Sequence, residues 1–424
     1  MDRLIVEGGA RLEGRLRASG SKNAVLPVMA AALLTDEPLR LANVPRLRDV
    51  ATMERILESL GVAVRRGDDD VLELRSRDDG PCEAPYDLVS TMRASVCVLG
   101  PLVARRGRAR VSMPGGCVFG VRPVDLHVKG LNALGAAIDV EGGYLVSEVG
   151  RRLRGADLYL GSAAGSSVLA TAQVLSAAVL AEGTTVLDNA AMEPELEDLA
   201  RTLVAMGARI EGIGGHRLVI EGVERLHGAE VTISGDRIEA GTFLVGAAMT
   251  GGDVTVEGLD PRQFAAPREV LTRMGAEVSA GPDWMRCRAD GPLRAADVTT
   301  LPYPGFPTDL QAQVMAAMCV AEGISVVGER IFPDRFMHVA ELLRLGAAIR
   351  KEGAQAIVVG PARLSGATVM ASDLRASAAL VLAGLVAEGT TEVRRVYHID
   401  RGYERIDERL GGLGATIRRE VQPT

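Results

Sequence analysis

The chain has 424 residues, of which 47% are apolar and 24% charged, and its 48 basic and 55 acidic side chains give a formal net charge of −7. This composition is typical of a globular protein and argues against disorder, and the length leaves room for two or three domains. The negative charge disfavours a dedicated nucleic-acid-binding protein, which needs a basic face. We therefore expect a globular protein of enzyme size without a nucleic-acid partner.

No segment reaches the ~20 apolar residues that a membrane span needs, and the longest candidates lie near 168–181 and 376–387. The first residues, MDRLIVEGG, lack the apolar stretch of a signal peptide. The five cysteines are odd in number and show no Cys-x-x-Cys spacing, which disfavours a disulfide framework or a zinc site. We expect a cytoplasmic protein with no membrane partner and no bound metal.

Along the chain, one helix–glycine–strand pattern recurs six times, at intervals of 68–74 residues: LESLGVAV (57–64), LNALGAAI (131–138), LVAMGARI (203–210), LTRMGAEV (271–278), LLRLGAAI (342–349) and LGGLGATI (410–417). Each copy predicts a helix that ends at a glycine in the left-handed conformation and is followed by a strand. The six glycines are Gly61, Gly135, Gly207, Gly275, Gly346 and Gly414. The regular spacing predicts a repeated unit of about 70 residues.

A second series of glycines marks the middle of the units after the first: Gly107, Gly183, Gly252, Gly323 and Gly389. Most of them lie in a helix–glycine–strand segment such as VAEGTTEVRRV. One unit then holds two helices and several strands, too many for a thin solenoid. We expect three units around a shared axis in one domain, and two such triplets in the protein.

A third series marks helix starts, where the aligned residues are Lys22, Arg93, Ser166, Arg237, Asp309 and Arg375. Four of the six are cationic, although the first turn of a helix normally favours acidic side chains. If these helix starts converge between the two triplets, they would bind phosphate or carboxylate groups together with the free helix N–H groups. The alternative is six unrelated surface charges.

Three residues could have either a structural or a functional role: Cys117, Lys22 and Asp309. Cys117 lies in a glycine-flanked PGGC loop near Arg122, which could lower the thiol pKa, whereas Cys97 and Cys319 fall in apolar helical runs and are expected to be buried and inert. Lys22 could be an ordinary solvated side chain. Asp309, in FPTDLQAQ, could be a helix N-cap or a general base held among cations.

Several motifs, in order and spacing, resemble the UDP-N-acetylglucosamine 1-carboxyvinyltransferase family: SGSKNAVLP (19–27), MRAS (92–95), PGGCVFGVRPVDLH (114–127), GDRIEAGTFL (235–244), FPTDLQAQ (306–313), DRFMHVAEL (334–342), SDLRASAALVLAG (372–384) and YHIDRGYERIDERL (397–410). The resemblance covers essentially the whole chain. It implies an α/β fold of two inside-out α/β barrels of three repeats each, with the active site in the cleft between them. It also implies enolpyruvyl transfer from phosphoenolpyruvate to the sugar 3-hydroxyl, the first committed step of bacterial peptidoglycan synthesis.

The resemblance assigns roles residue by residue. Cys117 would be the acid that protonates the enol methylene carbon and the residue that fosfomycin alkylates, and Asp309 would be the base for the sugar hydroxyl. Lys22, Arg122 and Arg401 would stabilise the charge on the moving groups. The stretch at 122–126 would hold the nucleotide. The expected substrate-binding residues are Lys22, Asn23, Arg93, Arg122, Pro123, Val124, Asp125, Leu126, Ser162, Ala163, Ala164, Gly165, Arg237, Asp309, Ile331, Arg335, Asp373, Arg375 and Arg401.

The family pattern further implies a discontinuous domain formed by 1–21 plus 235–424, and a second domain, 22–234, that carries the Cys117 loop as a lid. No metal, organic cofactor or obligate protein partner is called for. From the residues alone, Asp373, Arg375 and Arg401 could equally serve as helix caps or i,i+4 ion pairs.

One segment departs from the family pattern. Where the family commonly has Ser-Val-Gly-Ala-Thr near the diphosphate, this chain reads GSAAGSS (161–167), with Ala163 and Ala164 in place of Ser and Val. Gly165 is kept, and Ser162 or Ser166 could supply a hydroxyl. The departure bears on the acceptor more than on the chemistry.

Four competing interpretations stay open. A shikimate-phosphate enolpyruvyl transferase shares the fold and a similar Gly-Ser-Lys start, although the Cys117 loop and the segment 122–126 argue against it. A relative that uses another nucleotide acceptor fits the altered 161–167 segment. A non-catalytic paralogue that binds the nucleotide sugar would not need Lys22, Cys117, Asp309 and Arg401 together. A purely structural repeat array would bind neither substrate.

Overall fold

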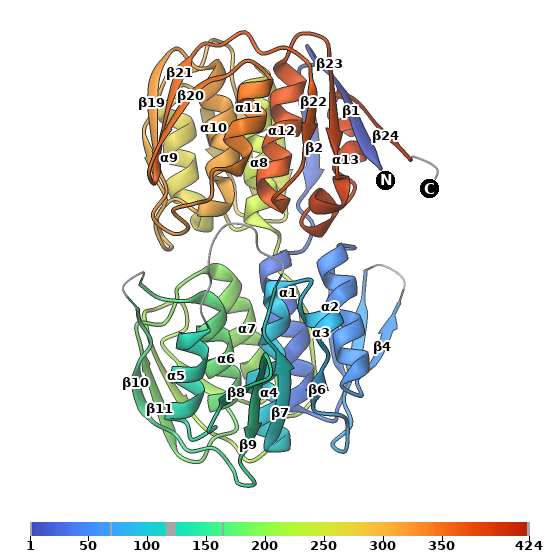
Figure 1. The fold of residues 1–424 in the computed structure, drawn as a ribbon, viewed down its shortest axis with the longest axis vertical. Helices are drawn as coiled ribbons and strands as arrows, with labels where there is room; N and C mark the ends of the chain where they lie inside the picture. Colours follow the sequence, from blue (N-terminus) through green and yellow to red (C-terminus); the bar gives the residue numbers. More distant parts are fainter. Residues whose placement is uncertain (1, 68–69, 116–123, 163–164, 422–424) are drawn as a thin grey trace. The chain divides into compact units, whose positions relative to one another are not determined.

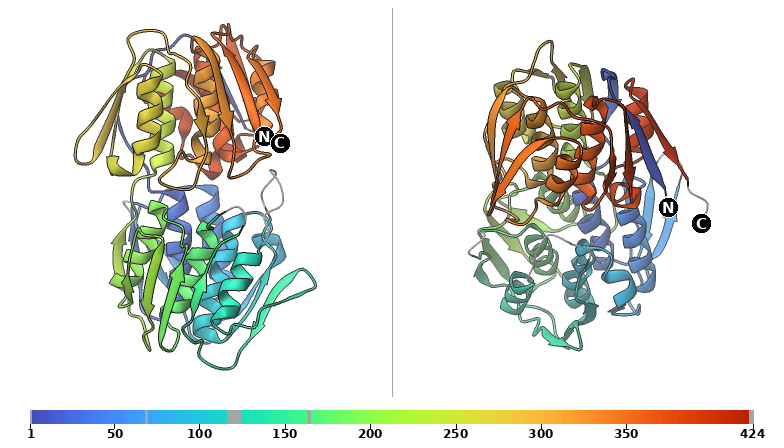
Figure 2. Two further views of the ribbon diagram at one scale, coloured as in Figure 1. Left: turned by 90° about the vertical axis from the view of Figure 1, so that its left-hand side faces the viewer. Right: turned by 45° about the horizontal axis from the view of Figure 1, so that its top comes forward.

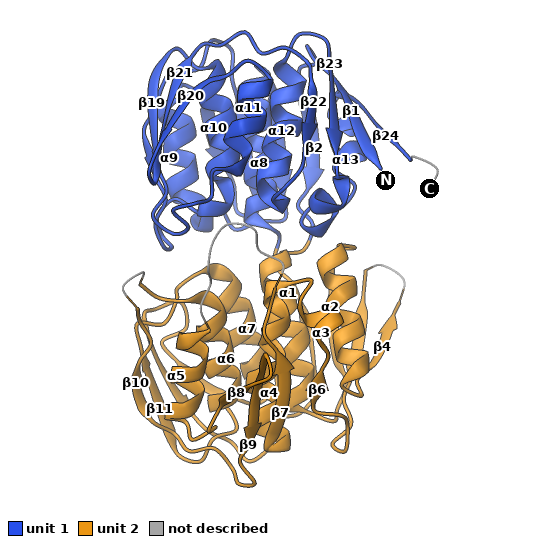
Figure 3. Cartoon of the chain, in the orientation of Figure 1, with its two compact units in different colours: residues 1–19, 118–120, 235–424 blue, residues 20–117, 121–234 orange. Residues whose placement is uncertain are grey.

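The computed structural model describes residues 2–67, 70–115, 124–162 and 165–421, and these residues form two compact units (Figure 3). Unit 1 comprises 2–19 and 235–421, and unit 2 comprises 20–115 and 124–234. The chain leaves unit 1 after Ser19 and returns to it at Gly235. The sequence-based domain boundaries fall after residues 21 and 234.

In unit 1 the strands form three four-stranded sheets, each with one parallel pair and two antiparallel pairs (Figure 1). The first sheet has the order β2 (Glu13–Arg17), β15 (Asp253–Glu257), β17 (Trp284–Arg288), β16 (Glu277–Ala280). The second has β18 (Val298–Thr299), β19 (Gly323–Gly328), β21 (Gln355–Gly360), β20 (Ala348–Glu352). The third has β22 (Thr368–Met370), β23 (Thr390–Arg394), β1 (Arg3–Glu7), β24 (Thr416–Glu420).

Unit 2 repeats this pattern in three further sheets. The first sheet has the order β14 (Ala229–Thr232), β3 (Leu39–Ala42), β5 (Leu72–Arg75), β4 (Ala63–Arg66). The second has β6 (Glu83–Ala84), β7 (Arg108–Ser112), β9 (Tyr144–Glu148), β8 (Asp139–Glu141). The third has β10 (Asp157–Tyr159), β11 (Thr184–Asp188), β13 (Arg217–Glu221), β12 (Arg209–Glu211).

Five of the six sheets in the described residues take three strands from one repeat and a parallel edge strand from another part of the same unit, so the repeats of a unit close into a ring. The sixth, with β22, β23 and β24, takes its central strand from the N-terminal segment. In unit 1 the closing strand is β1, which lies between β23 and β24 with Val6 opposite Thr391 and Ile417. The N-terminal and C-terminal strands therefore lie side by side, as both views of Figure 2 show. In unit 2, the late strand β14 pairs with the early strand β3.

The helices fall into two groups. The first group is buried almost all round and fills the interior of each unit: α1 (Lys22–Ala31), α4 (Leu99–Arg106), α6 (Val168–Ala178), α8 (Arg237–Met249), α10 (Gln311–Val320) and α12 (Leu374–Val386). The second group buries one face: α2 (Arg48–Ser59), α5 (Asp125–Ala133), α7 (Pro194–Ala205), α9 (Ala265–Arg273), α11 (Met337–Arg344) and α13 (Ile406–Gly412). Short elements complete the described chain: α3 (Tyr86–Val89), η1 (Ala32–Leu34), η2 (Arg93–Val98), η3 (Pro261–Phe264), η4 (Thr308–Leu310) and η5 (Val396–Arg401).

Composition explains this inside-out arrangement. A helix that is apolar on every side belongs in a protein interior. Every residue of α8 is buried, and it packs against α10 and α12, which also contact each other. The sheets alternate, with residues such as Val254 and Val256 of β15 facing this core. No helix among the described residues is both long and apolar enough to cross a membrane.

The left-handed glycines predicted at the helix ends of the first series are confirmed. All six glycines of the first series have a positive φ, between +81° and +101°. In the second series, Gly107, Gly183, Gly323 and Gly389 also have a positive φ, but Gly252 does not. There the left-handed residue is Gly251, and Gly252 lies so close to the chain that an added Cβ would fall 2.1 Å from the carbonyl oxygen of Leu12.

Candidate active site

Asp309 lies between two arginines of unit 1 rather than capping its helix. It is the middle residue of η4, and α10 starts two residues later, with no side-chain hydrogen bond at its cap. One carboxylate oxygen is 2.7 Å from Nη1 of Arg335, and the other is 3.9 Å from Nε of Arg375. The Asp309 side chain is 25% exposed, whereas the two arginines are 7% and 2% exposed. Of the two interpretations left open for Asp309, the N-cap is therefore wrong.

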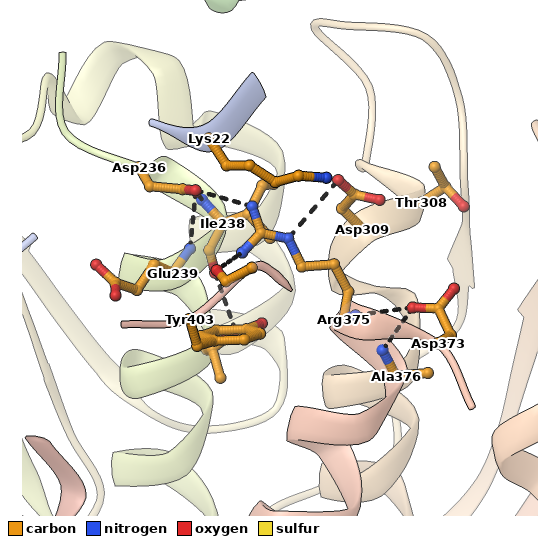
Figure 4. Close-up of polar contacts among 12 residues, drawn as sticks. Lys22, Asp236, Ile238, Glu239, Thr308, Asp309, Asp373, Arg375, Ala376 and Tyr403 are labelled. Carbon is orange, nitrogen blue, oxygen red and sulfur yellow. Dashed lines mark hydrogen bonds and ion pairs between the residues drawn. The ribbon is translucent and has the colours of Figure 1, made fainter. Parts of the chain in front are cut away.

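Arg375 is held by acidic and aromatic neighbours (Figure 4). Its Nη2 donates to Asp236 Oδ2 at 2.8 Å, and its Nη1 donates to the carbonyl oxygen of Gly402 at 3.0 Å. The guanidinium carbon lies 5.1 Å from the centre of the Tyr403 ring. Burial alone would lower the pKa of Arg375, but the charge of Asp236 raises it, so the group stays cationic.

Aspartates cap two of the helices that reach this site. Asp236 Oδ1 accepts from the N–H groups of Ile238 and Glu239 at the start of α8. Asp373 Oδ1 accepts from the N–H groups of Arg375 and Ala376 at the start of α12. These carboxylates offset both the free N–H groups and the cations that follow them.

Asp373 also pairs with Arg335, whose Nε lies 3.2 Å from its Oδ2. Burial would raise the pKa of Asp373, but the charge of Arg335 and the N–H of Ala376 outweigh it and hold that pKa below its usual value. Arg335 in turn has a raised pKa, because the charges of Asp373 and Asp309 outweigh its burial. Arg335 thus joins two carboxylates from different repeats.

A second layer of polar groups lies beneath this cluster. The Tyr403 hydroxyl is 2.8 Å from Thr242 Oγ1 and accepts from Gln313 Nε2 at 3.1 Å. The same Nε2 lies 3.0 Å from the carbonyl oxygen of Asp309. Since Tyr403, Thr242 and Gln313 are buried, this network fixes the ring beneath Arg375 and the backbone of Asp309.

Unit 2 carries its own cationic helix start. Lys22 is the first residue of α1, and its ammonium is 3.0 Å from the carboxylate of Asp49, in the first turn of α2. Both side chains are nearly buried, at 11% and 3% exposure. Asn23 follows on α1 and is half-buried.

Arg93 is the first residue of η2, and its charge reaches His127. Burial, with a smaller contribution from Arg93, lowers the pKa of His127 to about 3, so the ring is neutral at pH 7. Gln173 Oε1 accepts from the N–H of Gly100, which turns its Nε2 toward His127 Nδ1 at 3.0 Å. The ring proton is therefore on Nε2.

The remaining expected residues lie as follows. Val124 precedes α5. Asp125 is the first residue of this helix and is exposed, whereas Leu126, in its first turn, is buried. Ser162 and Gly165 close a tight turn through two backbone hydrogen bonds. Cys117, Arg122, Pro123, Ala163 and Ala164 lie outside the described residues.

In unit 1, three further expected residues have defined places. Arg237 starts α8, with its guanidinium carbon 5.7 Å from the centre of the Tyr303 ring. The Ile331 N–H donates to Glu329, and half-buried Arg401 ends η5. No group of three or more His, Cys, Asp or Glu side chains in the described parts of the chain is placed to hold a metal ion.

Two expectations about helix starts need correction. Ser166 does not correspond to Lys22 or Arg237, because Ser167 is the N-cap of α6 and the helix begins at Val168. Two of the four cations also have carboxylate partners within the protein: Asp49 lies next to Lys22, and Asp236 and Asp309 lie next to Arg375. The sequence showed the cations but not these partners, which come from other helices.

The two buried cysteines behave as expected. Cys97 and Cys319 are 3% and 0% exposed, and burial raises the pKa of each thiol to about 12. Neither can act as a nucleophile near neutral pH.

A ring of three α/β repeats around buried helices, found twice in one chain, together with an arginine–carboxylate cluster, defines the class of enolpyruvyl transferases. The enolpyruvyl transferase NikO from Streptomyces tendae superimposes with a TM-score of 0.89 at 28% identity, over 100% of this chain and 99% of that one. EPSP synthase from Acinetobacter baumannii has the same fold, with a TM-score of 0.77 at 21% identity and full coverage of both chains.

The sequence comparisons lead to the family. The sequence model of EPSP synthase (3-phosphoshikimate 1-carboxyvinyltransferase) matches residues 6–410, and the chain belongs to this family. Two relatives, from strains DP4 and Hildenborough of Nitratidesulfovibrio vulgaris, are 54% and 53% identical over 423 residues and covered completely. Both are named UDP-N-acetylglucosamine 1-carboxyvinyltransferase, so the resemblance based on the motifs and the expected fold class are confirmed.

Proposed function

We propose that this protein transfers the enolpyruvyl group of phosphoenolpyruvate to the 3-hydroxyl of UDP-N-acetylglucosamine and releases phosphate, as the first committed step of peptidoglycan synthesis. The relatives that are more than half identical over the whole chain carry that name. The observation that supports the chemistry most directly is Asp309, a partly exposed carboxylate beside two buried arginines. As part of this proposal, the reaction takes place in the cytoplasm.

The mechanism is an addition followed by an elimination. Asp309 takes the proton of the acceptor hydroxyl while Cys117 gives a proton to the methylene carbon, and the oxygen attacks C2 to form a tetrahedral ketal. A methyl proton of the ketal then returns to Cys117 as the C2–O bond to phosphate breaks, and the C=C double bond forms again as an enol ether of the acceptor. The cations Lys22, Arg122 and Arg401 stabilise the charge that develops on the phosphate and carboxylate.

The first experiment measures phosphate release from phosphoenolpyruvate with UDP-N-acetylglucosamine as acceptor, and identifies the product by mass. Detection of an enolpyruvyl nucleotide sugar as the product would support both the proposed reaction and the proposed acceptor. Release of phosphate with shikimate 3-phosphate instead would contradict the acceptor. Saturable binding of the nucleotide sugar without phosphate release would favour a non-catalytic paralogue.

A second candidate is enolpyruvyl transfer to a different nucleotide. The observation that favours it is the GSAAGSS segment, because alanines stand at 163 and 164 where the family has polar or branched residues. Ser162 lies in a turn closed with Gly165, and its Oγ is 3.4 Å from the Gly165 carbonyl oxygen. The same phosphate assay with a panel of nucleoside monophosphates and diphosphate sugars separates this candidate from the first.

Substitution of the acid tests the assignment of Cys117. Cys117→Ala should lower turnover by at least about a hundredfold, the usual loss for one general acid, and should abolish inactivation by fosfomycin. Cys97→Ala is the control, because that thiol is buried and protonated. Unchanged turnover and fosfomycin sensitivity in the Cys117 variant would show that another group supplies the proton.

A further inference from the structure

Glu329 is a buried carboxylate that the sequence patterns do not single out. It follows the last residue of β19 and is 1% exposed. Its Oε1 accepts from Thr300 Oγ1 at 2.6 Å and from the N–H groups of Ile331 and Phe332 at 2.8 and 2.9 Å. Its Oε2 accepts from Thr308 Oγ1 at 2.9 Å. Four donors converge on one side chain, so both carboxylate oxygens of Glu329 act as acceptors.

These bonds join the two segments that carry Asp309 and Arg335. Thr300 and Thr308 flank the stretch 301–307 before Asp309, while Ile331 and Phe332 start the loop that ends at Arg335. The N–H of Arg335 bonds back to the carbonyl oxygen of Phe332 at 2.8 Å. Glu329 therefore sets the position of both segments from one point.

The Thr308 side chain connects Glu329 to Arg335 of the candidate site. Arg335 Nη1, which can only donate, is 3.2 Å from Thr308 Oγ1 and 2.7 Å from Asp309 Oδ1. The Thr308 hydroxyl therefore accepts from Arg335 and gives its one hydrogen to Glu329. In the row of hydrogen bonds from Glu329 through Thr308 and Arg335 to Asp309, the donor and the acceptor of every bond are therefore fixed.

We propose that Glu329 is a positioning residue of the enolpyruvyl transfer, which acts through the Thr308 hydroxyl to hold Arg335 against Asp309. This inference rests on the proposed function, in which Asp309 is the base. Arg335 Nε and Nη2 lie 3.2 and 3.4 Å from the Asp373 carboxylate, while Nη1 contacts both Thr308 and Asp309. The bond to Thr308 therefore holds the Nη1 end of the guanidinium, and its loss frees that end to move away from Asp309.

The first test replaces one acceptor oxygen of the Glu329 side chain by a donor and keeps the shape of the side chain. In Glu329→Gln, the amide oxygen must stay with Thr300 and the two backbone N–H groups, which leaves the amide N–H₂ facing Thr308. We expect kcat to fall about tenfold, the usual effect of losing one oriented charged hydrogen bond, with the KM for the nucleotide acceptor within twofold of wild type. Glu341→Gln is the matched control, because Glu341 also binds a backbone N–H (of Met370, 3.0 Å) in unit 1 but touches neither segment.

The second test asks whether Glu329 acts through Thr308. Thr308→Val should match Glu329→Gln in kcat, Thr308→Ser should stay near wild type, and the double variant Glu329→Gln/Thr308→Val should be no worse than the Val variant alone. Additive losses in the double variant, or a wild-type kcat in Glu329→Gln, would overturn the proposal. If Glu329→Gln does not fold, the Val and Ser variants decide, and equal rates for these two would reject the relay.

A readout independent of activity separates this proposal from the proposed function. Amide hydrogen exchange in segments 300–309 and 329–336 should speed up in Glu329→Gln and not in Glu341→Gln. If the wild-type protein shows no enolpyruvyl transfer, faster exchange in Glu329→Gln would keep the positioning role while the reaction is rejected. Unchanged exchange would reject the positioning role whatever the activity.

Discussion

His338 shows what a buried ionisable side chain without a partner does to stability. It lies on α11, is 1% exposed, and neither ring nitrogen has a hydrogen-bond partner among the described residues. Burial, helped by the charge of Arg335 and opposed by that of Asp373, lowers its pKa to about 4. A histidine with a lowered pKa in the folded state stabilises fully above its unfolded pKa of about 6.5, and this stability is lost as the pH falls toward 4.

We therefore expect His338→Leu to flatten the acid side of the stability curve. Between pH 6 and pH 4.5, the wild type should lose about 1.4 kcal/mol of unfolding free energy per pH unit more than the variant, the slope of one titrating group. Chemical denaturation across this range measures the difference, with the exposed His216→Asn as control. Parallel curves for His338→Leu and wild type would show that the ring is already solvated and charged in the native state.

At the scale of elements, the glycines that end the helices are needed for their backbone conformation. Gly135 has a φ of +87°, and a Cβ added there would have no atom within 4 Å, so a methyl group meets only backbone strain. Gly411 also has open space, but it lies inside α13 without a positive φ. Comparing Gly135 with Gly411 therefore separates the cost of a positive φ from the cost of a steric clash.

Gly135→Ala should lower the unfolding free energy by about 1–2 kcal/mol, the cost of a left-handed conformation in a residue with a side chain. Gly411→Ala should leave it unchanged or raise it by up to about 1 kcal/mol, because alanine favours helix more than glycine does. Thermal unfolding of both variants compares them directly. Equal destabilisation would mean that close contacts, rather than φ, select these glycines.

The same elements show which features of the fold can be predicted from the sequence. Spacing was enough to predict six repeats and six left-handed glycines, because a helix end is a local feature of the chain. The start of α6 was placed two residues early, since the helix begins at Val168 and not at Ser166.

Partners on other helices could not be predicted in this way. Asp49 of α2 lies next to Lys22 of α1 in the same repeat, and Asp236 at the start of α8 lies next to Arg375 of α12 in another repeat; both pairs form only when the helices pack. Glu329 escaped notice for a related reason, since one carboxylate after a strand has no distinctive spacing, and its four donors come from two separate loops.

At the scale of the whole molecule, we propose that each unit is a domain that folds by itself. Unit 1 depends on two strands from the N-terminus, because β1 is a central strand and β2 pairs with β15. In the antiparallel pair β1–β24, Arg3 lies opposite Glu420, so a short hairpin loop can join the two ends.

A permuted chain tests this division. Residues 235–421, a loop of about four residues and then residues 2–19 should fold into a compact, cooperatively melting unit 1. The fragment 235–424 without the added strands should be unfolded or insoluble, since the core residues Leu4 and Val6 and the central ladder are missing. A well-folded fragment 235–424, or a permuted chain that stays unfolded, would contradict the proposed domain.

The central place of β1 also sets an order of events during synthesis. Strand β1 leaves the ribosome long before β23 and β24, the strands with which it pairs, whose residues begin at Thr390. At typical rates of about 5–20 residues per second, β1 waits roughly 20–80 seconds for these partners. Unit 2 is complete by residue 234 and can fold in that interval while an apolar N-terminal strand remains unpaired. The growing chain therefore exposes an unpaired apolar strand while the residues between β1 and β23 are made. During this time a chaperone that covers short extended apolar segments would raise the yield of native protein.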